Sequence, residues 1–218
     1  RPAALRSSPS VRGPATIAAL YVLDSGARAV TATVLALHAY ATYKQFGAAN
    51  ADSYVSATYS TVAFVAFVVT FLTPLLIHRF GRNKVYLAGV ACCMIGMAAL
   101  ATSTVLGLGA GLVGRALSGV IGSICLILFI VDFIPRQNLV RSETLRLFVS
   151  CIAWGLGPVL GVWLYKHFGI VAPAIASIAV HSVLVSYFRH LKLAQPTVES
   201  TPPPRNPLIM VRRFAGQK

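Results

Sequence analysis

Long apolar stretches alternate with short basic segments along the whole chain. The clearest stretch is residues 85–131, in which Arg115 is the only charged side chain. A helix crosses the hydrocarbon layer of a bilayer with about 20 apolar residues, so this stretch is long enough for two membrane spans. We place the turn between them at residues 107–109, Gly-Leu-Gly. The pattern predicts a chain that lies in a membrane.

Similar stretches recur up to residue 193 and predict an all-α integral membrane protein with six transmembrane helices. The predicted spans are residues 15–43, 54–77, 85–106, 110–133, 147–165 and 170–188. The connectors are residues 45–53, 78–84, 107–109, 134–146 and 166–169. We therefore divide the chain into an N-terminal segment (residues 1–14), a six-span bundle (15–193) and a proline-rich tail (194–218), with both end segments in the cytoplasm.

Composition agrees with this interpretation. Hydrophobic residues make up 56% of the chain and charged residues 11%, whereas ordinary globular domains have roughly 25% charged residues. The mean hydropathy is +0.74. These values exclude a water-soluble globular domain.

The distribution of basic residues predicts the orientation. With the N-terminus in the cytoplasm, the outer side receives only Lys44 and Lys166. The cytoplasmic side then holds Arg1, Arg6, Arg12, Arg79, Arg82, Lys84, Arg136, Arg141, Arg146, Arg189, Lys192, Arg205, Arg212, Arg213 and Lys218. This is a strong positive-inside bias, and it accounts for the net charge of +14. We do not expect a nucleic-acid partner, because no stacking aromatics lie between the basic residues.

Cysteine and histidine residues are scattered, and we expect neither a metal site nor a cofactor. All four cysteines fall within predicted spans, and adjacent Cys92 and Cys93 point about 100° apart on a helix. We interpret the cysteines as small, buried, reduced thiols. His38 and His181 also lie within spans. For each, two interpretations remain: a histidine that is hydrogen-bonded inside the bundle, or one that handles protons.

Three charges lie at membrane depth and carry the most information about function. Asp24 and Arg28 are spaced i, i+4 in the first span and can pair on one helix face, and Arg115 lies in the fourth span. Charged groups at this depth face a partner or a watery cavity. The pair is therefore either a purely structural ion pair or, with Arg115 and His38, part of a substrate or proton pathway.

The six spans also form two similar triplets. The first span of each triplet contains a membrane charge, and the second contains a proline, Pro74 or Pro158. Repeated triplets with functional groups at corresponding places are typical of secondary transporters. We therefore predict a 3+3 repeat.

Three local motifs lie in or between these spans. In residues 74–84, PLLIHRFGRNK, Gly81 permits a tight reversal of the chain. In the fourth span, Gly119 and Gly122 follow Arg115 and allow another helix to approach closely. In the fifth span, residues 155–161 read GLGPVLG, where proline removes a backbone hydrogen bond.

Together with the six-span topology, these motifs resemble the N-terminal half of a major facilitator superfamily transporter, most similar to drug/proton antiporters. The 74–84 segment is similar to the family's cytoplasmic gate motif at Arg79, Gly81, Arg82 and Lys84, with proline at position 74 and histidine at position 78 where the family has Gly and Asp. Arg115 fits the family's membrane arginine. The antiporter motif is matched by Gly157, Pro158 and Gly161.

The resemblance implies half of a membrane transporter, not an enzyme. We expect proton-coupled antiport or efflux of a small organic molecule, with Asp24 as the titrating acid and Arg28 and Arg115 as its modulating cations. The expected partners are the substrate, the proton, the lipid bilayer and a second six-helix half, in a bacterial inner membrane. Alternatives are organic-anion or sugar uptake, and a non-transporting receptor or assembly factor with the same bundle. We also predict an Asp132–Arg82 salt bridge at the gate.

Overall fold

A computed structural model describes residues 13–47, 49–134 and 139–191. Six helices occupy the described part: α1 (Gly13–Gln45), α2 (Ala51–Phe80), α3 (Arg82–Leu100), α4 (Val105–Phe133), α5 (Leu139–Phe168) and α6 (Val171–His190). Each contains a segment long and apolar enough to cross a membrane. The predicted all-α, six-span architecture is confirmed. Of the two end segments predicted from the sequence, only residues 13 and 14, in the first turn of α1, lie within the described residues.

One predicted turn is wrong. We placed it at residues 107–109 with the third span reaching residue 106, but α3 ends at Leu100 and α4 begins at Val105. Thr104 caps α4, because its side-chain oxygen accepts a 3.0 Å hydrogen bond from the backbone N–H of Gly107. Gly107 and Gly109, which we predicted to form a turn, therefore lie inside α4. The predicted connector 134–146 is also too long, because α5 begins at Leu139.

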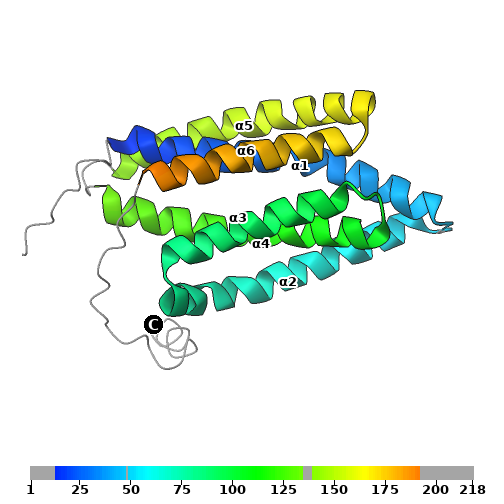
Figure 1. Ribbon diagram of the computed structural model, residues 1–218, viewed down its shortest axis with the longest axis horizontal. Helices are drawn as coiled ribbons and strands as arrows, with labels where there is room; N and C mark the ends of the chain where they lie inside the picture. The colour runs from blue at the N-terminus through cyan, green and yellow to red at the C-terminus, as the bar shows by residue number, and fades with distance from the viewer. Residues whose placement is uncertain (1–12, 48, 135–138, 192–218) are drawn as a thin grey trace, which may run out of the picture.

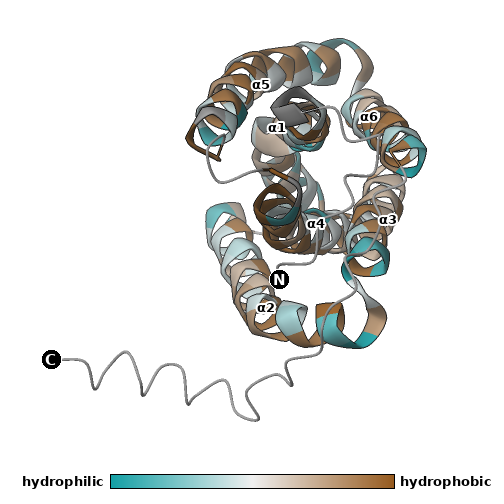
Figure 2. Cartoon of the chain, turned by 90° about the vertical axis from the view of Figure 1, so that its left-hand side faces the viewer, coloured by the Kyte–Doolittle hydropathy of each residue, from teal (hydrophilic) through white to brown (hydrophobic). Residues whose placement is uncertain are grey.

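The helices run along the long axis of the bundle (Figure 1). We call the end where α1, α3 and α5 begin the proximal end, and the other the distal end. Viewed along the helices, α1 and α4 lie near the centre, with α5 and α6 on one side of them and α2 and α3 on the other (Figure 2). Exchanging the triplets α1–α3 and α4–α6 maps the pairs α1–α4 and α3–α6 onto themselves and each of the other packed helix pairs onto another packed pair. This packing agrees with the predicted 3+3 repeat.

Two helix pairs, α1–α5 and α3–α4, make the most extensive contacts, and glycine brings both pairs together. A Cβ atom at Gly157 of α5 would lie 2.5 Å from the Cβ of Ala29, and one at Gly161 would collide with the carbonyl oxygen of Val30. On α4, a Cβ atom at Gly114 would lie 2.5 Å from the carbonyl oxygen of Cys92. These backbone contacts exclude any larger side chain at the three glycines.

The cysteines differ in their surroundings. Cys93 and Cys125 are buried, whereas Cys92 and Cys151 are exposed. All four are free thiols. The expectation that all four are buried is therefore wrong for two of them, because Cys92 and Cys151 lie on helix faces that the described residues leave exposed.

Candidate functional site

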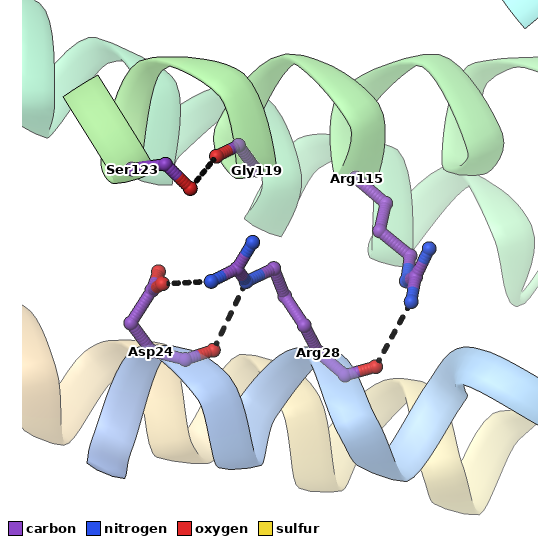
Figure 3. Close-up of polar contacts among 5 residues, drawn as sticks. All are labelled: Asp24, Arg28, Arg115, Gly119 and Ser123. Carbon is purple, nitrogen blue, oxygen red and sulfur yellow. Dashed lines mark hydrogen bonds and ion pairs between the residues drawn. The ribbon is translucent and has the colours of Figure 1, made fainter. Parts of the chain in front are cut away.

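Asp24 and Arg28 form an ion pair on the face of α1 that is turned toward α4 (Figure 3). Arg28 Nη2 donates to Oδ2 of Asp24, and Arg28 Nε donates to the Asp24 carbonyl oxygen at 3.3 Å. Asp24 is fully buried, with 0% of its surface exposed. The i, i+4 pairing predicted from the sequence is confirmed. A charge this deep in the bundle requires such a partner.

Two glycines of α4 make room for the pair. A Cβ atom at Gly119 would lie 3.1 Å from Nη1 of Arg28, and one at Gly122 would lie 3.5 Å from Oδ1 of Asp24. On the same helix, the hydroxyl of Ser123 donates to the Gly119 carbonyl oxygen at 2.7 Å (Figure 3). The glycines noted in the sequence thus allow α4 to approach the charged groups of α1.

Arg115 completes the group from α4. Its side chain points toward α1, and Nη2 donates to the carbonyl oxygen of Arg28 at 3.4 Å (Figure 3). Within the described residues Arg115 forms no ion pair, and its Nε has no hydrogen-bond partner. It interacts electrostatically with Arg28 and with Tyr59 of α2. The site therefore holds two guanidinium groups and one carboxylate.

His38 lies apart from this site. It is fourteen residues beyond Asp24 on α1, which corresponds to about 21 Å along the helix. It is buried, lies 3.4 Å from the Thr42 hydroxyl and makes an edge-to-face contact with Tyr165 of α5. The structure therefore brings Asp24, Arg28 and Arg115 together and leaves His38 near the distal end.

The predicted gate motif lies at the proximal end. Gly81 joins α2 to α3 with φ = 84°, a conformation that favours glycine. Arg82 pairs with Asp132 near the end of α4, as predicted, and its guanidinium lies 4.4 Å from the centre of the Phe129 ring. The side chain of Arg82 is 9% exposed and that of Asp132 is 37% exposed.

The other two cations of the motif are arranged differently. Arg79 and Lys84 are exposed, and Arg79 lies 5.5 Å from the centre of the Phe80 ring. Neither forms an ion pair with an acid within the described residues. Arg82 is therefore the member of the motif that holds α3 against α4.

The antiporter-type motif contacts α1 directly beside the charged pair. Gly157 and Gly161 pack on Ala29 and Val30, which follow Arg28 in the sequence. α5 continues as one helix through Pro158. The expectation that these glycines keep a neighbouring helix close is confirmed.

Sequence reasoning did not assign Ser177 and His181 of α6 to this site. The Ser177 hydroxyl donates to the Ala27 carbonyl oxygen at 2.9 Å, and His181 is fully buried. The available signal was the i, i+4 spacing of a serine and a histidine within an apolar span. Within the described residues, no group of three or more His, Cys, Asp or Glu side chains could hold a metal ion.

Comparison with known protein families identifies the chain. The family model described as "Sugar (and other) transporter" matches residues 14–128, which is just over half of the sequence. The chain belongs to this transporter family. The match runs through α1, α2, α3 and most of α4, and it includes Asp24, Arg28 and Arg115. Comparisons with the curated proteins and with the solved structures gave no match.

Membership of the sugar (and other) transporter family fixes the broad class of the protein. The chain is an integral membrane protein with half of a major facilitator fold, and the family is one of transporters, not of enzymes. Membership implies secondary transport of a small molecule across a membrane.

Proposed function

We propose that the chain is one half of a proton-coupled secondary transporter for a small organic molecule, and that Asp24 is the residue that carries the coupled proton. Asp24 is the single fully buried acid among the described residues, and this observation carries the proposal. The described acids Asp132 and Glu143 have side chains that are 37% and 39% exposed, and Asp52 is exposed as well.

The geometry supports an exchange of partners during transport. When Asp24 is ionised, it holds Arg28, and the ion pair is stable at membrane depth. When Asp24 binds a proton, the carboxyl group becomes neutral and Arg28 loses its counter-charge. Arg28 is then available to an anionic group of the substrate, together with Arg115, which already contacts the Arg28 carbonyl oxygen. Proton binding and substrate binding are thereby linked through one side chain.

The proximal end is the cytoplasmic side in this proposal, and the Arg82–Asp132 pair is part of the gate on that side. The bundle of residues 15–193 pairs with a second six-helix half, because transporters of this superfamily enclose their cavity between two halves. The proline-rich tail after residue 193 is the cytoplasmic linker. We propose antiport or efflux because Gly157, Pro158 and Gly161 match the antiporter motif and pack beside the charged pair.

The proposal is tested with the full-length protein in liposomes that carry a pH gradient, screened over a substrate panel. Asp24→Asn removes the titrating group but keeps the shape of the side chain. We expect it to abolish transport against a concentration gradient while exchange of substrate down its gradient persists. Asp52→Asn, the same change at an exposed acid of α2, is the matched control and should transport as the unmodified protein does. Uphill transport by Asp24→Asn would show that the coupling acid lies elsewhere.

A second candidate function is uptake of an organic anion or a sugar. The surplus of one guanidinium group over carboxylates at the site favours an anion, whereas the description of the matched family names sugars. Neutral sugars and small organic anions in the same panel separate the two. Arg115→Gln should reduce transport of an anion strongly and that of a neutral sugar less, because only the anion loses a counter-charge.

A further inference from the structure

His181 is a buried base with an unused lone pair. Its Nδ1 lies 2.8 Å from the carbonyl oxygen of Ser177. Because a carbonyl oxygen only accepts hydrogen bonds, Nδ1 must carry the hydrogen, and Nε2 of the neutral ring then holds the lone pair. Nε2 has no hydrogen-bond partner, and the residue is 0% exposed.

The position of His181 relative to α1 follows from one hydrogen bond. The Ser177 hydroxyl donates to the carbonyl oxygen of Ala27, and α1 and α6 run in opposite directions (Figure 1). His181 follows Ser177 by four residues, so it lies level with the residues that precede Ala27 by three or four. One of these is Asp24. Asp24 and His181 accordingly interact electrostatically.

Asp24 has an unused acceptor in the same region. Its Oδ2 accepts from Arg28, but Oδ1 has no hydrogen-bond partner. A polar atom that is left unpaired in the interior destabilises the folded protein. Oδ1 of Asp24 on α1 is a free acceptor, and Nε2 of His181 on α6 is a free base. Both residues are fully buried and lie at one level of the bundle. This arrangement indicates that the two groups hydrogen-bond to each other when Nε2 is protonated.

Among the titratable groups near His181, Asp24 is the acid that interacts with it. Within the described residues, Asp24 and Arg28 are the charged side chains that interact electrostatically with His181. On α3, which also packs against α6, Tyr86 and Cys93 interact with Asp24 instead. On α5, none of the described titratable groups interacts with His181.

We propose that His181 is a second proton-binding residue, which competes with Arg28 for the carboxylate of Asp24. A proton that arrives from the translocation path forms an N–H bond at Nε2, and the ring becomes an imidazolium with hydrogens on both nitrogens. The new N–H donates to Oδ1 of Asp24, and the positive charge of the imidazolium weakens the attraction between the carboxylate and Arg28, which an anionic group of the substrate then binds together with Arg115. The reverse step returns the proton to the path. This inference rests on the proposed role of Asp24 and assigns the residue that acts with it.

Nitrogen NMR of the histidine rings in the full-length protein tests the proposal without a substrate. The protein carries ¹⁵N-labelled histidine in lipid nanodiscs, and the signals lost in His181→Gln assign His181. The ratio of protonated to neutral His181 is measured at about pH 6.5, the ordinary pKa of histidine. At this pH, Asp24→Asn should lower the ratio about tenfold. Arg28→Gln should raise that ratio, because it removes a competing cation.

Two controls are built into the measurement. Asp52→Asn removes an exposed acid and should leave the His181 ratio unchanged. His38 lies about 21 Å from Asp24 along α1, so its signal should not respond to Asp24→Asn. At alkaline pH, the neutral His181 ring should carry its hydrogen on Nδ1.

The proposal is overturned if the His181 ratio is the same in the unmodified protein, Asp24→Asn and Arg28→Gln, or if the neutral ring carries its hydrogen on Nε2. Arg28→Gln alone still decides the matter if Asp24→Asn does not fold. A response of His181 together with uphill transport by Asp24→Asn would contradict only the proposed coupling role of Asp24. Loss of uphill transport without a response of His181 would contradict only the present inference.

Discussion

The α2–α3 junction and the α5–α6 junction turn the chain in a similar way but are held by different interactions. Each is made by one glycine with positive φ, Gly81 at 84° and Gly169 at 69°. In each, the glycine N–H donates at 2.9 Å to the carbonyl oxygen four residues earlier, of Ile77 or of Tyr165. The two junctions occupy corresponding places in the two triplets and lie at opposite ends of the bundle (Figure 1).

The residue after each glycine makes the difference. At the proximal junction it is Arg82, which pairs with Asp132 and lies over the Phe129 ring. At the distal junction it is Ile170, which is 5% exposed and packs in an apolar cluster with Val34 and Leu35 of α1, among others. The proximal junction is therefore held by a charge pair and the distal one by hydrophobic contact, although the repeat gives both the same turn.

Placing a charge at the distal junction should have the largest effect. Ile170→Arg buries a guanidinium group in a cluster whose described members are all apolar or aromatic, and an unpaired buried charge costs about 3–5 kcal/mol. We expect a loss of that order in the free energy of unfolding, measured by titration with a denaturing detergent. Val171→Arg, the same change at the exposed neighbouring residue, is the control. Equal stability of the two variants would contradict the apolar character of this junction.

Replacing the two junction glycines should have smaller and similar effects. Gly81→Ala and Gly169→Ala each force a side chain into a left-handed backbone conformation, which costs about 1–3 kcal/mol. The same unfolding titration measures both. Gly155→Ala is the matched control in α5, because a Cβ atom there meets nothing within 4 Å. A loss at one junction and none at the other would show that the two turns are not equivalent.

The proximal charge pair should have the smallest effect. A double-mutant cycle with Arg82→Gln and Asp132→Asn should give a coupling energy of about 1 kcal/mol, because the carboxylate is partly exposed. Salt should lower this coupling. The Arg146–Glu143 pair provides a local pair for comparison, because its residues are three positions apart on α5 and Arg146 Nη2 lies 2.6 Å from Glu143 Oε2. The absence of any coupling between Arg82 and Asp132 would remove the contrast between the junctions.

The fold could be predicted from the sequence because hydropathy and helix spacing are local properties. Six spans, the Asp24–Arg28 pair and the reversal at Gly81 all follow from residues close together in the chain. The Asp132–Arg82 pair came from the family resemblance instead. The predicted turn at residues 107–109 was wrong because Thr104 caps α4, so that the glycines after it lie inside the helix.

The remaining features of the site depend on how distant helices are aligned, which no local pattern encodes. The level of His181 beside Asp24 is fixed by the hydrogen bond from Ser177 to Ala27, 150 residues apart. The role of Gly119 in making room for Arg28 likewise depends on the alignment of α4 with α1. The sequence pointed to His181, as a histidine within a span, and to Gly119, but it could not show what these residues contact.

The glycine contacts in α1–α5 and α3–α4 have a mechanical consequence. Side chains can adjust to a sliding helix by changing rotamer, but the backbone atoms that meet at Gly161 and Gly114 cannot. We therefore expect each pair to move as one rigid body. The boundary between these two bodies is the α1–α4 interface, and Asp24 lies on it. In the proposed function, one proton bound there would bias the relative motion of four helices.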